Sequence, residues 1–372
     1  MIACYRVKDA LYRLASKDDD AMLRRMLREN TMPSWVTITT EREPSYFDGA
    51  ALMDQSYTFI AEDTNNNKKN IGMYACSMLP VHIDKKATRI GYFGGMRLNH
   101  EYRHKIRYIK QGFQAIEELL PESTVLPYYF TSLASENTKA RRLLEANVTG
   151  MPSYKPQGEM STLVFSVKHG MERRILHQAQ VRDIPEIAAF YNKYASQYQL
   201  APYLSEEWLR DLDGHMGLKI SDFWLVRGKN HSIEGCLAIW DQRTFKQSVV
   251  KAYRSPLTYL RGFYNLVARL TKRVELPVVS EALEHVFIAF FAFHDRKKAI
   301  RALKEAAKLS QEKKASSCVL GLSSQHPLFA DIKRVFKPSI YRTEIETVML
   351  QGAGADAPNF SGDIVQPEIA LL

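Results

Sequence analysis

A cluster of cations lies where a helix should begin, in the stretch EYRHKIRYIKQGFQAIEELL at residues 101–120. The second half of this stretch has an apolar residue every three or four positions, which predicts a helix with one buried face. The first half carries Arg103, His104, Lys105 and Arg107. A helix N-terminus already has partial positive charge and usually attracts acidic residues. The cluster therefore indicates a helix start that binds an anion. The alternative is a group of basic side chains that are simply exposed to solvent.

The strand before this helix has two adjacent glycines, in the run Gly94-Gly95-Met96-Arg97-Leu98. Paired glycines inside a strand are typical of a bulge, or of a place where a ligand or another backbone approaches closely. A kink that only serves packing is the competing interpretation.

Both features belong to a first half in which helical and strand-like segments alternate. Runs at 71–83 and 88–99 predict an antiparallel hairpin that leads into the basic helix start. A strand at 125–134, a helix from Asn137 and a closing strand at 158–167 follow. The second half repeats this order, with an apolar strand at 286–293, a basic junction and another amphipathic helix. We interpret this as a duplication.

The expected fold class is therefore α+β (mixed α/β), with two tandem domains that each have a mostly antiparallel sheet flanked by helices. We expect a first domain at 1–168, a second at 172–351 and a flexible tail at 352–372, because the tail begins rich in Gly, Pro and Ala.

Composition indicates a soluble protein with anionic partners. The chain has 372 residues, a net charge of +10 and a pI of about 9.2. Its four cysteines lack metal-binding spacing, so we expect reduced thiols and no metal. We see neither a signal peptide nor a membrane span, and we expect a cytoplasmic protein with no membrane partner.

The order of elements and three local passages resemble the GNAT superfamily of N-acetyltransferases. MRLNHEYRH is similar to the family passage that enters the pyrophosphate loop, and ENTKARRLL is similar to its later helix start, with Asn137 in register. IGM after the polar turn is similar to the family's strand opening. These passages cover most of residues 11–167, and the second half resembles the same fold more faintly. The duplicated chain is similar to a tandem-GNAT group of bacterial acetyltransferases.

The resemblance implies acetyl-CoA as the acyl donor. Its pantetheine arm would lie along the glycine-containing strand, and its pyrophosphate would meet the N–H groups at the helix start. This sequence departs from the family loop, because His104 and either Ile106 or Arg107 stand where glycines are expected. Cationic side chains could hold the phosphates instead. The residues implied in cofactor binding are Gly95, Met96, Arg97, Leu98, Arg103, His104, Lys105, Ile106, Arg107 and Asn137.

The family's usual glutamate base and tyrosine acid are missing at the matching positions, where the strand lacks an acid and Leu144 replaces the tyrosine. The substitutes we predict are Tyr92, Glu41 and Tyr129, although each is also an ordinary core or capping residue. Transfer by positioning alone is a further possibility in this fold.

The second half offers less. Its loop, FHDRKKAIRALKEA, has no glycine; Asp295 would repel phosphate, while Arg296, Lys297 and Lys298 would attract it. We therefore expect this half to shape the site rather than to catalyse. An insertion without counterpart contains YLRGFYNLVARL, whose apolar helical face would pack in a core or cover a pocket.

Three functions remain open. The first is an N-acetyltransferase that moves an acetyl group from acetyl-CoA directly to an amine acceptor that the sequence does not identify. The second is a catalytically silent acyl-CoA sensor with the same fold. The third and least favoured is a nucleic-acid binder: basic and acidic residues are interspersed and no recognition motif is present, so we expect no nucleic-acid partner. Oligomers are possible.

Overall fold

The structure is a computed structural model that describes residues 3–31, 35–48, 55–121, 124–126, 128–146, 148–212, 217–350, 360 and 362–372. These residues form a mixed α/β fold around one large, mostly antiparallel sheet, which confirms the expected fold class.

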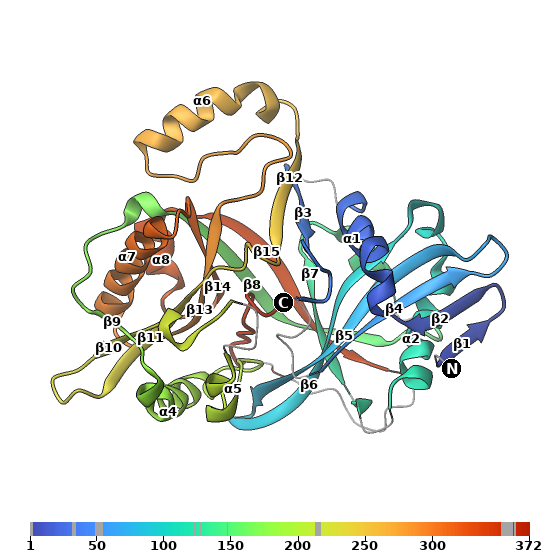
Figure 1. Cartoon of the computed structure of the whole chain (residues 1–372), viewed down its shortest axis with the longest axis horizontal. Coiled ribbons are helices and arrows are strands. Elements are labelled where there is room, and N and C mark those ends of the chain that lie inside the picture. The colour runs from blue at the N-terminus through green and yellow to red at the C-terminus, as the bar shows by residue number, and fades with distance from the viewer. Residues whose placement is uncertain are drawn as a thin grey trace.

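The described residues build a sheet of thirteen strands in the order β1-β2-β4-β5-β6-β7-β15-β8-β14-β13-β11-β10-β9. Its strands are β1 (Cys4–Val7), β2 (Ala10–Leu14), β4 (Gln55–Asp63), β5 (Lys69–Ile83), β6 (Lys86–Leu98), β7 (Tyr129–Ala134), β8 (Ser153–Ser166), β9 (Leu176–Gln178), β10 (Phe223–Arg227), β11 (Ile233–Trp240), β13 (His285–Phe293), β14 (Ser317–Ser323) and β15 (Ser339–Met349). The predicted hairpin is the long β5–β6 pair (Figure 1).

Helices cover both faces of this sheet (Figure 1). They are α1 (Asp20–Glu29), α2 (Ile106–Leu119), α3 (Thr138–Leu144), α4 (Ile184–Ala195), α5 (Glu206–Arg210), α6 (Leu257–Leu270), α7 (Arg296–Glu312) and α8 (Phe329–Phe336). The predicted apolar face of α2 is buried, with Ile109, Phe113 and Ile116 packed on the first half of the sheet. Helices α7 and α8 cover the second half in the same way. A central core on the opposite face joins α4 to residues of the β5–β6 hairpin, including Leu79 and Val81.

The two halves exchange their last strands. β8, from the first half, pairs with β14 of the second half, and β15, from the second half, pairs with β7 of the first. β8 and β15 also pair with each other, so the sheet is continuous across the middle of the molecule (Figure 1). The domain boundary expected at 168–172 lies in the connection between β8 and β9 and stays a prediction.

A second connection between the halves is a two-stranded ribbon of β3 (Val36–Glu41) and β12 (Gln247–Tyr253). The ribbon carries α6, which stands away from the sheet at the top of Figure 1. The insertion is helical as expected, but core packing was the wrong expectation for its apolar face, since Tyr259 is 85% and Phe263 69% exposed.

The tail expected at 352–372 also needs a correction. Residues 351–359 and 361 lie outside the described residues, but 362–372 pack into the central core, where Val365, Ala370 and Leu371 are buried. Apolar side chains dominate this last stretch, and their burial outweighs the flexible composition of the residues before it.

Candidate functional site

Strands β6 and β7 separate after a short parallel pairing. They are in register only from Gly91–Tyr129 to Phe93–Thr131, whereas β6 continues along β5 as far as Leu98. The edge of β6 that faces away from β5 therefore has no strand partner after Phe93 among the described residues. A backbone edge of this kind can pair with an extended ligand.

A bulge lies at the start of this free edge, as the paired glycines predict. Met73 pairs with Arg97 and Ala75 with Gly94, so that Tyr74 of β5 faces two residues of β6. Gly95 has φ +65°, a conformation that residues with a Cβ rarely adopt. Gly95 and the neighbouring Met96 are exposed. A bulge leaves backbone groups of the extra residue outside the ladder, where a ligand can use them.

The free edge leads directly into the start of α2. Lys105 is the N-cap residue, and its side chain makes no capping hydrogen bond. No described residue accepts a hydrogen bond from the N–H groups of His104, Ile106 or Arg107. None of these three residues has a positive φ, so the helix start forms without the glycines that the GNAT resemblance led us to expect. Unpaired N–H groups and the helix dipole together attract phosphate.

The cationic side chains around this helix start have replaceable partners. Arg103 donates to the Leu98 carbonyl (3.2 Å) and to Asn30 Oδ1 (2.8 Å). Arg107 forms an ion pair with Asp9 (2.5 Å), and the Arg107 side chain is about half exposed. Ion pairs and hydrogen bonds of exposed side chains are weak, so a phosphate could replace these contacts.

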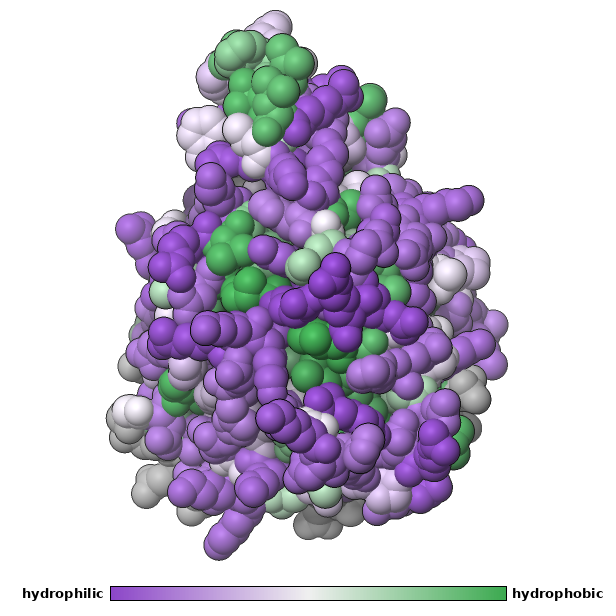
Figure 2. Space-filling view, turned by 90° about the vertical axis from the view of Figure 1, so that its left-hand side faces the viewer, coloured by the Kyte–Doolittle hydropathy of each residue, from purple (hydrophilic) through white to green (hydrophobic). Residues whose placement is uncertain are grey.

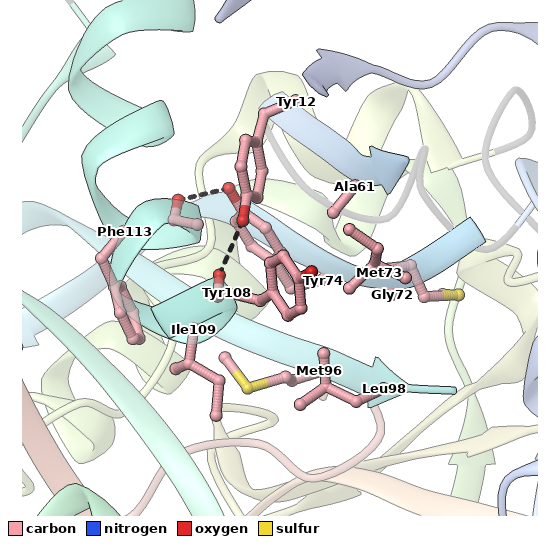
Figure 3. A pocket seen from close by; sticks show the side chains of 12 residues that line it. Tyr12, Ala61, Gly72, Met73, Tyr74, Met96, Leu98, Tyr108, Ile109 and Phe113 are labelled. Atoms are coloured by element: carbon pink, nitrogen blue, oxygen red, sulfur yellow. Dashed lines mark hydrogen bonds between the residues drawn. The ribbon is translucent and has the colours of Figure 1, made fainter. Parts of the chain in front are cut away.

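A small apolar cavity adjoins the free edge on the α2 side. Figure 3 shows Met96 and Leu98 of β6 beside Ile109 and Phe113 of α2, with Tyr74 of β5 nearby. Its volume is about 20 Å³, which is enough for roughly one water-sized group. A long acyl chain would have to widen it.

The predicted catalytic tyrosines lie on opposite faces of the sheet. Tyr129 faces α2, is fully buried, stacks on Phe93 at 4.3 Å and accepts a hydrogen bond from the Leu126 N–H. Tyr92 faces the other way and packs near Phe130 at 5.0 Å. Burial raises the pKa of the Tyr92 hydroxyl to about 12, so this group keeps its proton at neutral pH. The two hydroxyls cannot act on the same atom.

Glu41, the third predicted catalytic residue, ends strand β3 of the ribbon. Its carboxylate is buried and paired with the Lys251 ammonium (2.6 Å) and the Thr39 hydroxyl (2.9 Å). No hydrogen bond joins it to Tyr92 or Tyr129. Asn137 caps α3, where its side chain accepts a hydrogen bond from the Ala140 N–H.

Arg97 has an unusual environment on the Tyr92 side of β6. Burial lowers the pKa of its guanidinium, while Tyr46, Tyr92 and Tyr341 are electrostatic neighbours. Its Nε is buried and has no hydrogen-bond partner in the described part of the chain. Tyr341 was not predicted to lie here, because the strand exchange brings it from the second half.

A buried carboxyl that the sequence did not indicate lies two strands from β6. Glu346 of β15 pairs across the ladder with Thr131, which itself neighbours Phe93. Its side chain is completely buried, and neither oxygen makes a hydrogen bond of normal geometry with a described residue. Burial, and next the nearby Glu145 charge, raises the pKa of Glu346 to about 7. Glu346 was not identified from the sequence, because both strands that flank β15, β7 and β8, come from the first half.

The second half contains the same backbone arrangement as the first. β13 and β14 are parallel and in register only from His285–Ser317 to Phe287–Val319. Against β11, strand β13 has a register shift at the corresponding place, where Phe290 has φ +51°. The second half therefore forms this bulge at a phenylalanine, whereas the first half forms it at Gly95.

In the second half, carboxylate side chains of the protein itself bind the N–H groups of the bulge and of the helix start. Glu368 accepts hydrogen bonds from the Phe290 N–H (2.8 Å) and the Ala370 N–H (3.1 Å). Asp295 caps α7 by accepting from the Lys298 N–H (2.8 Å). The Ile369 side chain lies against Gly321 of β14. The bulge and the helix start of the second half are therefore filled, while those of the first half are open.

Comparisons with known proteins show the fold. No protein-family model matches the chain, and no curated protein matches its sequence. Among solved structures, Saccharomyces cerevisiae N-myristoyltransferase with bound myristoyl-CoA aligns with a TM-score of 0.61 at 9% identity, over 92% of this chain and 83% of that one. The same enzyme with bound myristoyl-CoA and inhibitors aligns with a TM-score of 0.60 at 8% identity, over 93% and 81%. At such identities the likeness establishes the common fold.

Proposed function

We propose that this chain is an N-acyltransferase of the GNAT type that moves an acyl group, acetyl in the first instance, from coenzyme A directly to an amine. The observation that carries the proposal is the free, bulged edge of β6 that ends at an uncapped helix start. The filled counterpart in the second half supports the choice of the first half as the donor site. The fold is one that, in the yeast enzyme, binds an acyl-CoA.

In this proposal the pantetheine arm of acetyl-CoA pairs with the edge of β6 and the pyrophosphate binds the start of α2. The backbone supplies most of the contacts, and the cations add charge-assisted hydrogen bonds. The small cavity beside Met96 favours a short acyl group over a long one. The residues assigned to the donor are Gly95, Met96, Arg97, Leu98, Arg103, His104, Lys105, Ile106 and Arg107, with Asn137 shaping the neighbouring α3 start.

The chemistry needs a donor for the oxyanion, and the proton that the amine loses must reach the departing thiolate. The bulge N–H groups near Gly95 would serve the first task. Tyr92 is assigned the second task because its side chain lies against Gly94 at the bulge. Burial raises its pKa to about 12, so the hydroxyl would give a proton to the thiolate only as it takes the one that the amine loses. Glu41 and Tyr129 would then act by positioning: Glu41 fixes the ribbon through Lys251, and Tyr129 supports Phe93. The amine would arrive from the side of Tyr92, where the second half forms the wall.

Calorimetric titration with acetyl-CoA at low and moderate salt tests the donor site. We expect one site per chain, with affinity reduced about tenfold or more in an Arg103→Ala, Lys105→Ala variant. The matched control is Arg296→Ala, Lys297→Ala at the capped start of α7, which should bind as the wild type does. Absence of binding in both buffers would refute the proposal. Binding without transfer to any of a panel of amines would favour the silent acyl-CoA sensor.

A further inference from the structure

The polar and apolar faces of helix α6 are reversed relative to those of an ordinary surface helix. Its polar face is turned inward, where Asn265 exchanges hydrogen bonds with the backbone of Leu276 (2.8 and 2.9 Å) and Ala268 is buried. A surface helix normally turns its apolar stripe toward the core. Here the stripe faces solvent, and it consists of Tyr259, Leu260, Phe263, Leu266, Val267 and Leu270, all at least 40% exposed.

The stripe forms an isolated apolar surface on α6, at the end of the ribbon of β3 and β12. Figure 2 shows hydrophobic side chains gathered at the top of the molecule, above the body, where Figure 1 places α6. Val278 and Val279 in the following loop are also exposed. So is Trp35, which directly precedes β3 and accepts a hydrogen bond from the Arg254 N–H just before α6. Solvation of so much apolar surface is unfavourable, which indicates that something covers it.

The charge of the same segment identifies the partner. Residues 254–274 contain five cations, Arg254, Arg261, Arg269, Lys272 and Arg273, and no acidic residue. Glu275 follows and pairs with Arg269 and Lys168. Lys272 and Arg273 are exposed and form no ion pair with a described residue. Two copies of the chain joined through α6 would bring these cations together, whereas an anionic lipid surface would neutralise them.

We propose that α6 is a membrane-surface anchor, whose apolar stripe enters the headgroup region of an anionic bilayer while the flanking cations bind lipid headgroups. An exposed apolar face beside basic residues is the pattern of helices that lie in the bilayer interface. The described residues contain no helix that is long and apolar enough to span a membrane, and a surface anchor requires none. From the sequence we expected no membrane partner; that expectation considered only spanning segments.

This inference does not depend on the acyltransferase proposal. The test is co-sedimentation of the full chain with vesicles of pure phosphatidylcholine and with vesicles of an equal mixture of phosphatidylcholine and phosphatidylglycerol. We expect binding to the mixed vesicles only. Phe263→Ser with Leu266→Ser should weaken it about tenfold or more, because both side chains would leave the bilayer. Lys272→Gln with Arg273→Gln should weaken it about fivefold for each cation removed.

Two controls separate the anchor from unspecific attraction. Val181→Ser removes an exposed apolar side chain far along the chain from α6, and Arg296→Gln with Lys297→Gln removes two exposed cations elsewhere. Both should bind as the wild type does. The substituted side chains are all exposed, so unfolding should not obscure the result. Absence of binding to mixed vesicles, or equal binding by the Phe263→Ser, Leu266→Ser variant, would overturn the proposal. A dimer that this variant abolishes, without vesicle binding, would instead assign the face to a second copy.

Discussion

The buried Glu346 carboxyl makes a quantitative prediction about stability and pH. Its pKa rises from 4.5 in an exposed glutamate to about 7, chiefly because burial disfavours the charged form. Each pKa unit corresponds to about 1.4 kcal/mol, so the charged carboxylate costs the folded protein about 3 kcal/mol. Between these two pKa values the folded protein holds a proton that the unfolded chain releases. The free energy of unfolding therefore falls as pH rises from about 4.5 to 7, and stays low above that.

The substitution Glu346→Gln removes this dependence. At low pH both side chains are neutral, and the difference between variant and wild type reports only packing. As pH rises to 8, the variant should gain about 3 kcal/mol relative to the wild type, which corresponds to roughly 3–6 °C in Tm for a chain of this size. Thermal unfolding measured across this pH range supplies the comparison.

The control is Glu207→Gln on the exposed helix α5, where the wild-type and variant curves should run parallel. Parallel curves for Glu346→Gln as well would refute the reasoning, because Glu346 would then ionise in the folded protein as it does in the unfolded chain.

Three further predictions concern the bulges and the proton donor, and Gly262→Ala on α6 is the control for the second of them. Tyr92→Phe should lower kcat of acyl transfer by about 10²–10⁴ and leave calorimetric acetyl-CoA binding unchanged, as loss of a general acid does. Gly95→Val should weaken acetyl-CoA binding and lower the free energy of unfolding by about 1–3 kcal/mol, measured in urea, because of its positive φ. Gly262→Ala on exposed α6 has no close neighbour and should change stability in the opposite direction, by about 0.5–1 kcal/mol. Glu368→Ala should cost about 1–3 kcal/mol in urea unfolding below pH 7, since the Phe290 N–H loses its partner; no change would contradict the filled second site.

Local patterns predicted the parts of the first half that bind the donor in our proposal. The three-to-four spacing of apolar residues predicted α2, and the adjacent glycines at 94 and 95 predicted the bulge in β6. Both signals are local, because helix periodicity and positive φ depend on residues close in the chain.

The pairing of strands that lie far apart in the chain could not be predicted from the sequence. β8 and β15 have the same alternation whichever strand they join, so nothing in their residues predicts the exchange. The burial of Glu346 and the approach of Tyr341 to Arg97 both follow from that pairing. We also did not predict that residues 362–372 are packed or that the apolar face of α6 points outward. Composition shows that a segment is apolar but does not identify what it packs against.

The exchange of the last strands affects how the protein can fold while it is being synthesised on the ribosome. β7 ends at Ala134, but β15, which covers its edge, begins only at Ser339. Roughly 200 residues must be synthesised in between, which takes roughly 10–40 s at about 5–20 residues per second. During that time the nascent first half exposes an open strand edge that could pair with another chain. Slowing translation or removing chaperones should therefore lower the yield of folded protein more than it does for a chain whose halves close independently.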